Sequence, residues 1–202
     1  MRIISGTSKG RKLATPRTHF LRPTSDRVKE SLFNILRDDI EGKAVLDLFA
    51  GTGNLGIEAL SRGAQKAIFV ENGRQALRLI QKNLKQAGLE DKSEIIPKDA
   101  TDAIGMLNQR GESFDVILMD PPYERGWIQK TLMKLNSHPI VHQNTILVIE
   151  RVRWEPLPDP LEGWNLIRHR RIGDTVLSFL IPHKKGTPNK AGRESQILSP
   201  KP

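Results

Sequence analysis

Along most of the chain, short continuous apolar runs alternate with segments whose apolar residues recur at helical spacing. The apolar runs predict buried strands, and the segments between them predict helices of roughly ten residues. The predicted strands are residues 44–49, 67–70, 94–96, 114–119 and 145–150. The predicted helices between them are residues 54–62, 75–87, 101–109 and 127–135. This alternation predicts an α/β fold, with a mostly parallel sheet and helices on both faces.

The two ends of the chain depart from this alternation. Residues 3–4 and 12–13 predict a small N-terminal hairpin, and Thr24 or Ser25 can cap a helix that begins near Asp26. Near the other end, residues 164–170 and 175–181 predict an antiparallel hairpin that finishes the sheet. We therefore expect a basic arm, a single α/β domain and a disordered, polar tail, at residues 1–25, 26–182 and 183–202.

Positive charge gathers at both ends. The net charge is +9, of which residues 1–29 carry +7 and residues 183–202 carry +4, so the body between them carries −2. Basic ends on a nearly neutral body favour a polyanionic partner, most simply a nucleic acid, although ordinary solubility charge is the alternative. Arg27 can equally pair with Glu30 on its own helix. The candidate phosphate ligands are Lys9, Arg11, Lys12, Arg22 and Arg27.

Composition excludes several classes of protein. The chain has no cysteine, which excludes disulfides, thiolate metal sites and cysteine catalysis. No apolar run is long enough to span a membrane, and the N-terminus lacks the apolar segment of a secretory signal, so we expect a cytoplasmic protein. His138 and His142 are separated by Pro139 and have no carboxylate close by in sequence, so we expect no metal site. With no apolar seam left over, we expect a monomer.

A glycine-rich loop follows the first predicted strand of the domain. Gly51, Gly53 and Gly56 have the spacing Gly-x-Gly-x-x-Gly, which lets the backbone turn tightly and approach a ligand. Glu71 closes the next strand, where a carboxylate can bind ribose hydroxyls. The motif alone also fits a dinucleotide site. Asp47, however, lies just before the loop and would repel a pyrophosphate, whereas it suits a cationic or amino-acid ligand.

A second loop follows the buried strand 114–119 and reads Asp120-Pro121-Pro122-Tyr123. The two prolines fix the backbone, so that the Asp120 carboxylate and the Pro121 carbonyl can act as hydrogen-bond acceptors. Acceptors suit an exocyclic amino group, and the flat ring of Tyr123 can stack on a base. The alternative is a Pro-Pro turn with a capping aspartate and a packed tyrosine. The candidate catalytic residues are Asp120, Pro121, Pro122 and Tyr123.

Asp-Leu-Phe-Ala-Gly-Thr-Gly at residues 47–53, followed later by Asp-Pro-Pro-Tyr, resembles S-adenosylmethionine-dependent methyltransferases that modify exocyclic amino groups. More closely, the chain resembles the RsmD type, which methylates guanine N2 in small-subunit ribosomal RNA. Residues 2–6, 10–13, 22–36, 55–64 and 120–123 carry this closer resemblance. It implies a Rossmann-like class I methyltransferase fold with a seven-stranded sheet, S-adenosylmethionine as cofactor, and ribosomal RNA, the small subunit or an assembly intermediate as partner.

The resemblance also implies roles for individual residues. Asp47 and the backbone of residues 51–53 would hold the methionine end of the cofactor, Glu71 the ribose, and Asp99 the adenine amino group beside Ala100. Asp47 could instead cap the loop, and Asp99 could cap the helix that follows it. The full set of expected cofactor-binding residues is Asp47, Phe49, Gly51, Gly53, Asn54, Glu71, Asn72, Asp99 and Ala100.

Other classes remain as alternatives. DNA adenine-N6 methyltransferases also use Asp-Pro-Pro-Tyr, but they usually need a recognition domain for which 202 residues leave no room. The chain could also be a catalytically silent RNA-binding assembly factor or a nucleotide-dependent dehydrogenase. The intact second loop argues against both. Glu58 is expected to be a surface charge or a partner of other site residues. The three tryptophans, Trp127, Trp154 and Trp164, are expected to pack against other residues, not to form a platform on which a base stacks.

Overall fold

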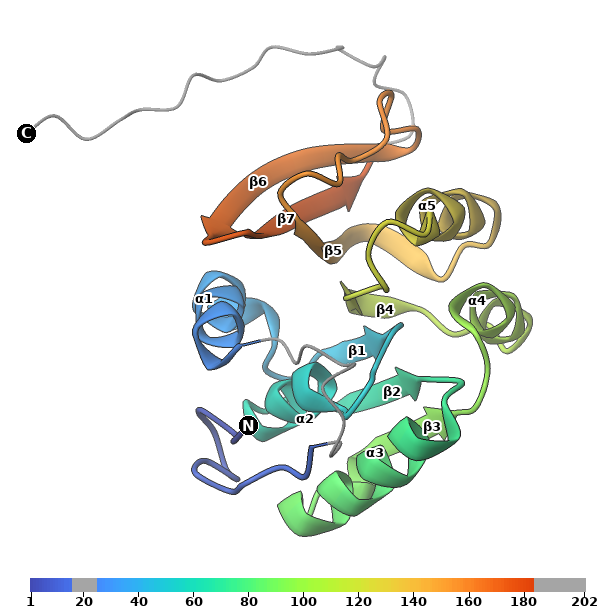
Figure 1. The fold of residues 1–202 in the computed structure, drawn as a ribbon. Helices are drawn as coiled ribbons and strands as arrows, with labels where there is room; N and C mark the ends of the chain where they lie inside the picture. Colours follow the sequence, from blue (N-terminus) through green and yellow to red (C-terminus); the bar gives the residue numbers. More distant parts are fainter. Residues whose placement is uncertain (16–24, 184–202) are drawn as a thin grey trace, which may run out of the picture.

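A seven-stranded sheet forms the centre of the computed structural model, which describes residues 1–15 and 25–183 (Figure 1). Its strand order is β3-β2-β1-β4-β5-β7-β6. Strands β1 to β5 pair in parallel, whereas β7 pairs antiparallel with both β5 and β6. The strands are β1 (Ala44–Asp47), β2 (Lys66–Val70), β3 (Ser93–Ile96), β4 (Phe114–Met119), β5 (Val141–Val152), β6 (Trp164–Ile172) and β7 (Thr175–Pro182). The predicted Rossmann-like sheet, which ends in an antiparallel hairpin, is confirmed.

Helices cover both faces of the sheet and enclose two apolar cores. One core joins the sheet to α1, α2 and α3, and the other joins it to α4 and α5 (Figure 1). The helices are α1 (Asp26–Leu36), α2 (Asn54–Ser61), α3 (Arg74–Ala87), α4 (Ala100–Gln109) and α5 (Trp127–Ser137), with short 3₁₀ turns at Arg37–Asp39 and Glu90–Lys92. Ser25 caps α1, since its side chain accepts a hydrogen bond from the Val28 amide.

The largest difference from the predicted elements is at β5, which begins four residues earlier than its apolar run. Its first part is polar, and the pairing register with β4 shifts between Phe114 and Val116. Thr145 holds this irregular part in place, because its hydroxyl donates to the Phe114 carbonyl at 2.7 Å and accepts from the His142 amide at 2.9 Å. Side-chain hydrogen bonds of this kind leave no apolar pattern in the sequence, so the periodicity could not predict them.

The first residues of the chain form a hairpin-like arm that packs on α2. Arg2 and Lys12 are joined by an antiparallel bridge, and the Thr7 amide donates to the Ser61 carbonyl at 2.7 Å. Gly6 makes this approach possible: its φ is +83°, and a Cβ at this position would lie 1.7 Å from the Ser61 oxygen. The arm is therefore fixed against the body of the domain by backbone contacts.

Two expectations about single residues are wrong or only half right. Glu58 is not a surface charge: it is fully buried, and its carboxylate accepts hydrogen bonds from the amides of Ile4 and Ser5 at 2.8 and 3.0 Å. Trp164 is buried as expected, but Trp154 is 54% exposed and does not pack in the core. It follows the end of β5, where the chain has already left the sheet.

Some predictions concern residues that the structure does not describe. Arg22 and residues 184–202 lie outside the described ranges, so the expected phosphate contact of Arg22 and the expected disorder of the tail stay predictions. Within the described ranges, none of the helices is long and apolar enough to cross a lipid bilayer. No cluster of metal-ligating side chains occurs among the same residues.

Candidate active site

A cavity of about 540 Å³ opens at the carboxyl edge of the parallel strands. Its walls come from the loops that follow β1, β2, β3 and β4, together with Met1 from the arm. These loops meet because the parallel strands all end at one edge of the sheet, where open α/β folds bind their ligands. Twelve of the thirteen predicted catalytic and cofactor residues line the cavity: Asp47, Phe49, Gly51, Asn54, Glu71, Asn72, Asp99, Ala100, Asp120, Pro121, Pro122 and Tyr123.

Gly53 is the exception, and its role is in the backbone. It has a φ of +79° and is the N-cap residue of α2, where its amide donates to the Ala50 carbonyl at 2.7 Å. A Cβ here would lie 3.1 Å from Ile57. The glycine therefore turns the chain sharply from the loop into the helix, and residues on either side of it, Thr52 and Asn54, face the cavity.

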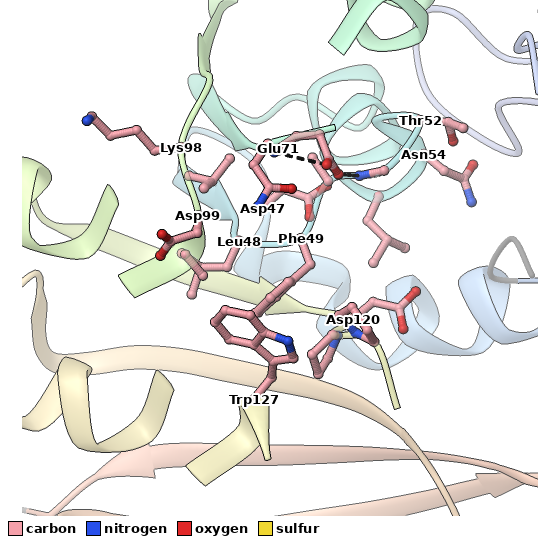
Figure 2. Close-up of a pocket in the computed structure, with 18 of the residues that line it drawn as sticks. Asp47, Leu48, Phe49, Thr52, Asn54, Glu71, Lys98, Asp99, Asp120 and Trp127 are labelled. Atoms are coloured by element: carbon pink, nitrogen blue, oxygen red, sulfur yellow. Dashed lines mark hydrogen bonds between the residues drawn. The ribbon is translucent and has the colours of Figure 1, made fainter. Parts of the chain in front are cut away.

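Glu71 organises the rim of the cavity through three backbone amides. One carboxylate oxygen, Oε1, accepts hydrogen bonds from Asn72 at 2.9 Å and Gly73 at 2.7 Å, and Oε2 accepts one from Gly51 at 2.9 Å (Figure 2). A carboxylate has about four acceptor positions, so one remains for a ligand. Glu71 thus ties the loop after β2 to the glycine-rich loop and still offers an acceptor to a hydroxyl group.

Asp47 is buried at the base of the cavity. Burial raises the pKa of its carboxyl group to about 7, and the nearby charges of Asp120 and Glu71 act in the same direction. The Gly56 amide donates to Oδ2 at 3.0 Å, whereas Oδ1 is buried and has no partner among the described residues. An unpaired buried acceptor of this kind favours a cationic or hydrogen-bond-donating ligand.

Asp99 lines the cavity and also caps a helix. It is the N-cap of α4: Oδ1 accepts hydrogen bonds from the amides of Thr101 and Asp102 and from the Thr101 hydroxyl. These bonds, with the Thr101 hydroxyl first, lower the pKa of Asp99. All of them end on Oδ1, so the capping role predicted from the sequence does not use Oδ2, and Asp99 also lines the cavity.

Two aromatic side chains and Asp120 form another wall of the cavity. Phe49 and Trp127 meet edge to face, with their ring centroids 5.7 Å apart, and Asp120 lies beside them (Figure 2). Figure 2 also shows Asp99 and Asn54 on opposite sides of the cavity, with Asp47 and Glu71 between them. The cavity is also lined by Trp127, Lys98 and Arg125, which the motifs in the sequence did not indicate. The proximity of Lys98 to Asp99 in sequence was the only available signal.

The predicted phosphate ligands of the arm and α1 are at the surface. Lys9, Arg11, Lys12 and Arg27 are all exposed, and none of them lines the cavity. Arg11 is partly engaged within the protein, because its guanidinium donates to the Gln86 carbonyl at the end of α3, at 2.9 Å. These four residues are therefore placed for contacts outside the cavity, not within it.

The cavity fits S-adenosylmethionine by the character of its polar atoms. Besides the acceptor of Asp47, the amide nitrogen of Asn54 is buried and has no partner among the described residues. A buried acceptor and a buried donor in one cavity suit a ligand that carries both a positive and a negative group, as the methionine part of this cofactor does. Glu71 and Asp99 supply further acceptors for hydroxyl and amino groups.

Comparisons with known proteins show which sequences and structures this chain is similar to. The family model described as "Conserved hypothetical protein 95" matches residues 1–181. The ribosomal RNA small subunit methyltransferase D of Escherichia coli K12 is 36% identical over 176 residues, which cover 87% of each chain. The same-named protein of Haemophilus influenzae is 36% identical over 174 residues, or 86% of this chain and 89% of the relative. The solved structure of YhhF from Escherichia coli has a TM-score of 0.79 and 32% identity, and covers 90% of this chain and 97% of that one.

The fold and the cavity define a Rossmann-like methyltransferase of class I whose methyl donor is S-adenosylmethionine. Within this class, the chain belongs to the RsmD-type methyltransferase family.

Proposed function

We propose that this protein transfers a methyl group from S-adenosylmethionine to the exocyclic N2 amino group of a guanine in small-subunit ribosomal RNA. The observation that carries the proposal is that the Asp120–Tyr123 loop lines the same cavity as Asp47 and Glu71. The cavity therefore contains both hydrogen-bond acceptors suited to an amino group and acceptors suited to a cationic nucleoside. The names of the relatives, which are ribosomal RNA small subunit methyltransferases, support the choice of RNA.

The chemistry of the amino group that receives the methyl group explains which residues form the Asp120–Tyr123 loop. The lone pair of a guanine amino nitrogen is delocalised into the ring, so this nitrogen is a weak nucleophile. When bound, S-adenosylmethionine supplies a methyl group made electrophilic by the sulfonium charge. The Asp120 carboxylate and the Pro121 carbonyl accept hydrogen bonds from the amino group. As the N–C bond forms and the S–C bond breaks, positive charge grows on the nitrogen, and these two acceptors stabilise it. One proton then leaves nitrogen, to Asp120 or to water.

The remaining loop residues hold the base. Pro122 is exposed and Tyr123 half-buried at the mouth of the cavity, where the tyrosine ring can stack on a base that has left its helix. Phe49 and Trp127 close the wall next to them. Holding donor and acceptor in line in this way contributes to the rate by orientation alone.

A labelling experiment tests the proposal. The protein is incubated with methyl-tritiated S-adenosylmethionine and, separately, with assembled small subunits, naked small-subunit RNA or duplex DNA. We expect label in RNA, either naked or in the subunit, and none in DNA. An Asp120→Ala variant that still binds S-adenosylhomocysteine in a calorimeter is the control for background. Label in DNA alone, or in no substrate, contradicts the proposal.

A further inference from the structure

The outermost strand of the sheet, β6, presents a basic surface that is separate from the cavity. All residues from Asn165 to Arg171 are exposed. Within the described residues, β6 pairs on one side only, with β7, so its other edge is open. The strand contains no acidic residue and carries Arg168, His169, Arg170 and Arg171. The three arginines lie far in sequence from the basic arm.

Apolar groups accompany these cations. Three of the four large hydrophobic side chains exposed in the described residues lie here: Leu166 at 38%, Ile167 at 54% and Trp154 at 54%. The pairing register shifts between Leu166 and Arg168, which leaves Ile167 as an extra residue of the kind that re-aims a strand. Charged edge strands also prevent pairing between chains, but exposed apolar side chains would work against that purpose.

Trp154 follows a residue, Arg153, that is bonded to the tip of the β6–β7 hairpin. Arg153 bonds to Asp174 in this tip through its backbone amide at 2.8 Å and through its guanidinium at 2.9 Å. The Arg153 guanidinium lies 5.6 Å from the centre of the Trp154 ring. An exposed flat ring next to arginines is the combination by which proteins hold phosphates and unstacked bases of RNA.

The register places this surface at the same sheet edge as the cavity. Because β7 runs antiparallel to both of its neighbours, β6 runs in the same direction as β5 and β4. The register makes Met119, at the end of β4, level with His169 of β6, so these two residues are three strand spacings or roughly 14 Å apart. Strand β6 then continues to Ile172 at the same edge of the sheet. Arg168 and Arg170 are opposite Phe179 and Leu177, which pack toward α1, so both arginines are on the α1 side of the sheet.

We propose that Arg168, Arg170 and Trp154, here called the β6 surface, bind the stretch of RNA next to the nucleotide that enters the cavity. This inference rests on the proposed function and assigns a second RNA contact to it. The arm packs on α2 and reaches α3, helices that cover the β1–β3 half of the sheet, whereas β6 is at the opposite end (Figure 1). The two basic regions thus lie on either side of the cavity.

The test is a double variant, Arg168→Ala/Arg170→Ala, in the full chain. We expect its affinity for the RNA substrate to fall about tenfold at physiological salt, and the slope of log affinity against log salt to decrease by nearly two. KM for RNA rises accordingly, while kcat and the affinity for S-adenosylhomocysteine stay unchanged. The matched control is Arg78→Ala/Lys82→Ala, which removes two exposed charges from α3 and should change RNA affinity less than twofold.

Trp154 provides a second, independent variant. Trp154→Ala should weaken RNA binding about fivefold or more, whereas Trp154→Phe, which keeps a flat ring, should largely restore it. The inference is overturned if the arginine variant binds RNA like the wild type or loses no more affinity than the α3 control. In that case, with the wild type still methylating RNA, the proposed function stands. If the β6 variants impair binding of DNA alone, only the inference about the β6 surface fails. If the wild type methylates no RNA, both proposals fail.

Discussion

Lys29 on α1 and Glu58 on α2 form an ion pair of 3.2 Å in which both side chains are fully buried. The Lys29 ammonium also donates to the Arg2 carbonyl and to the Asn54 side-chain oxygen, each at 2.7 Å. Glu58 in turn holds the arm through the Ile4 and Ser5 amides. One buried charge pair therefore connects the N-terminal arm to a residue that lines the cavity.

We predict that Lys29→Met destabilises the fold by about 3 kcal/mol, because it leaves the buried Glu58 carboxylate with Arg62, at 2.8 Å, as its remaining counter-charge. It also leaves the Arg2 carbonyl and the Asn54 oxygen without their donor. Burial already lowers the pKa of Lys29, although Glu58 opposes this effect. Urea unfolding measures the change. The control is Lys43→Met, which breaks a partly exposed 3.6 Å pair with Asp115 and should cost less than about 1 kcal/mol. Equal losses for the two variants would contradict a structural role for the buried pair.

The raised pKa of Asp47, about 7, predicts that cofactor affinity depends on pH. A cationic ligand stabilises the ionised carboxylate, so affinity for S-adenosylmethionine should rise from pH 6 to pH 8, with release of a proton at pH 6.5. Calorimetry in buffers of different ionisation enthalpy measures the proton. Asp47→Asn should bind more weakly and release none. A variant with the same proton release as the wild type would show that another group titrates.

The same shift has a consequence for the free protein. Since the folded pKa of Asp47 is raised from 3.8 to about 7, the folded state holds more protons than the unfolded state between these values. Its contribution to stability is therefore present below pH 3.8 and is lost as pH rises through 7. Asp47→Asn should remove this part of the pH dependence of the free energy of unfolding.

Substitutions at Asp99 should separate its capping function from its proposed contact with adenine. Serine is a good N-cap, so Asp99→Ser should keep the stability of α4 within a few tenths of a kcal/mol, whereas Asp99→Ala should cost about 1 kcal/mol. Both variants lose the carboxylate, and we expect both to bind S-adenosylhomocysteine about tenfold more weakly. Thermal unfolding and calorimetry give the two quantities. If Asp99→Ser binds like the wild type, the aspartate only caps the helix.

Asp120→Ala should abolish turnover and leave cofactor binding nearly intact. The carboxylate is proposed to act mainly on the charge that grows in the transition state, so kcat should fall by about 100-fold or more. Single-turnover rates with saturating RNA measure the effect, and calorimetry with S-adenosylhomocysteine shows whether the cavity is still formed. Turnover close to that of the wild type, in a variant that binds the cofactor normally, would remove Asp120 from the mechanism.

Sequence periodicity was sufficient for most of the fold because the core strands are continuous apolar runs. The predicted strand 114–119 coincides with β4, and the helix predicted near Asp26 begins at that residue. The glycine-rich loop and the Asp120–Tyr123 loop could be placed in one site because parallel strands end at one edge of a sheet. These inferences need only local pattern and a topological rule.

The remainder depends on contacts between residues far apart in sequence. Nothing local to Glu58 indicates that it is buried under the arm, since its partners Ile4 and Lys29 are more than twenty residues away. Trp127 forms part of the cavity wall, where it packs against Phe49, a residue far from it in sequence. The exposure of Trp154 and of β6 likewise follows from the strand order, which places β6 at the edge of the sheet.

The central claim is that one cavity brings a methyl donor to the amino group of a guanine in RNA. Digestion of RNA labelled by the protein, followed by mass spectrometry of the nucleosides, identifies the methylated atom most directly. The account predicts that the label is in N2-methylguanosine from small-subunit RNA. Label in N6-methyladenosine, in a ring-methylated base or in a ribose would contradict it, because the acceptors of Asp120 and Pro121 would then serve a different group.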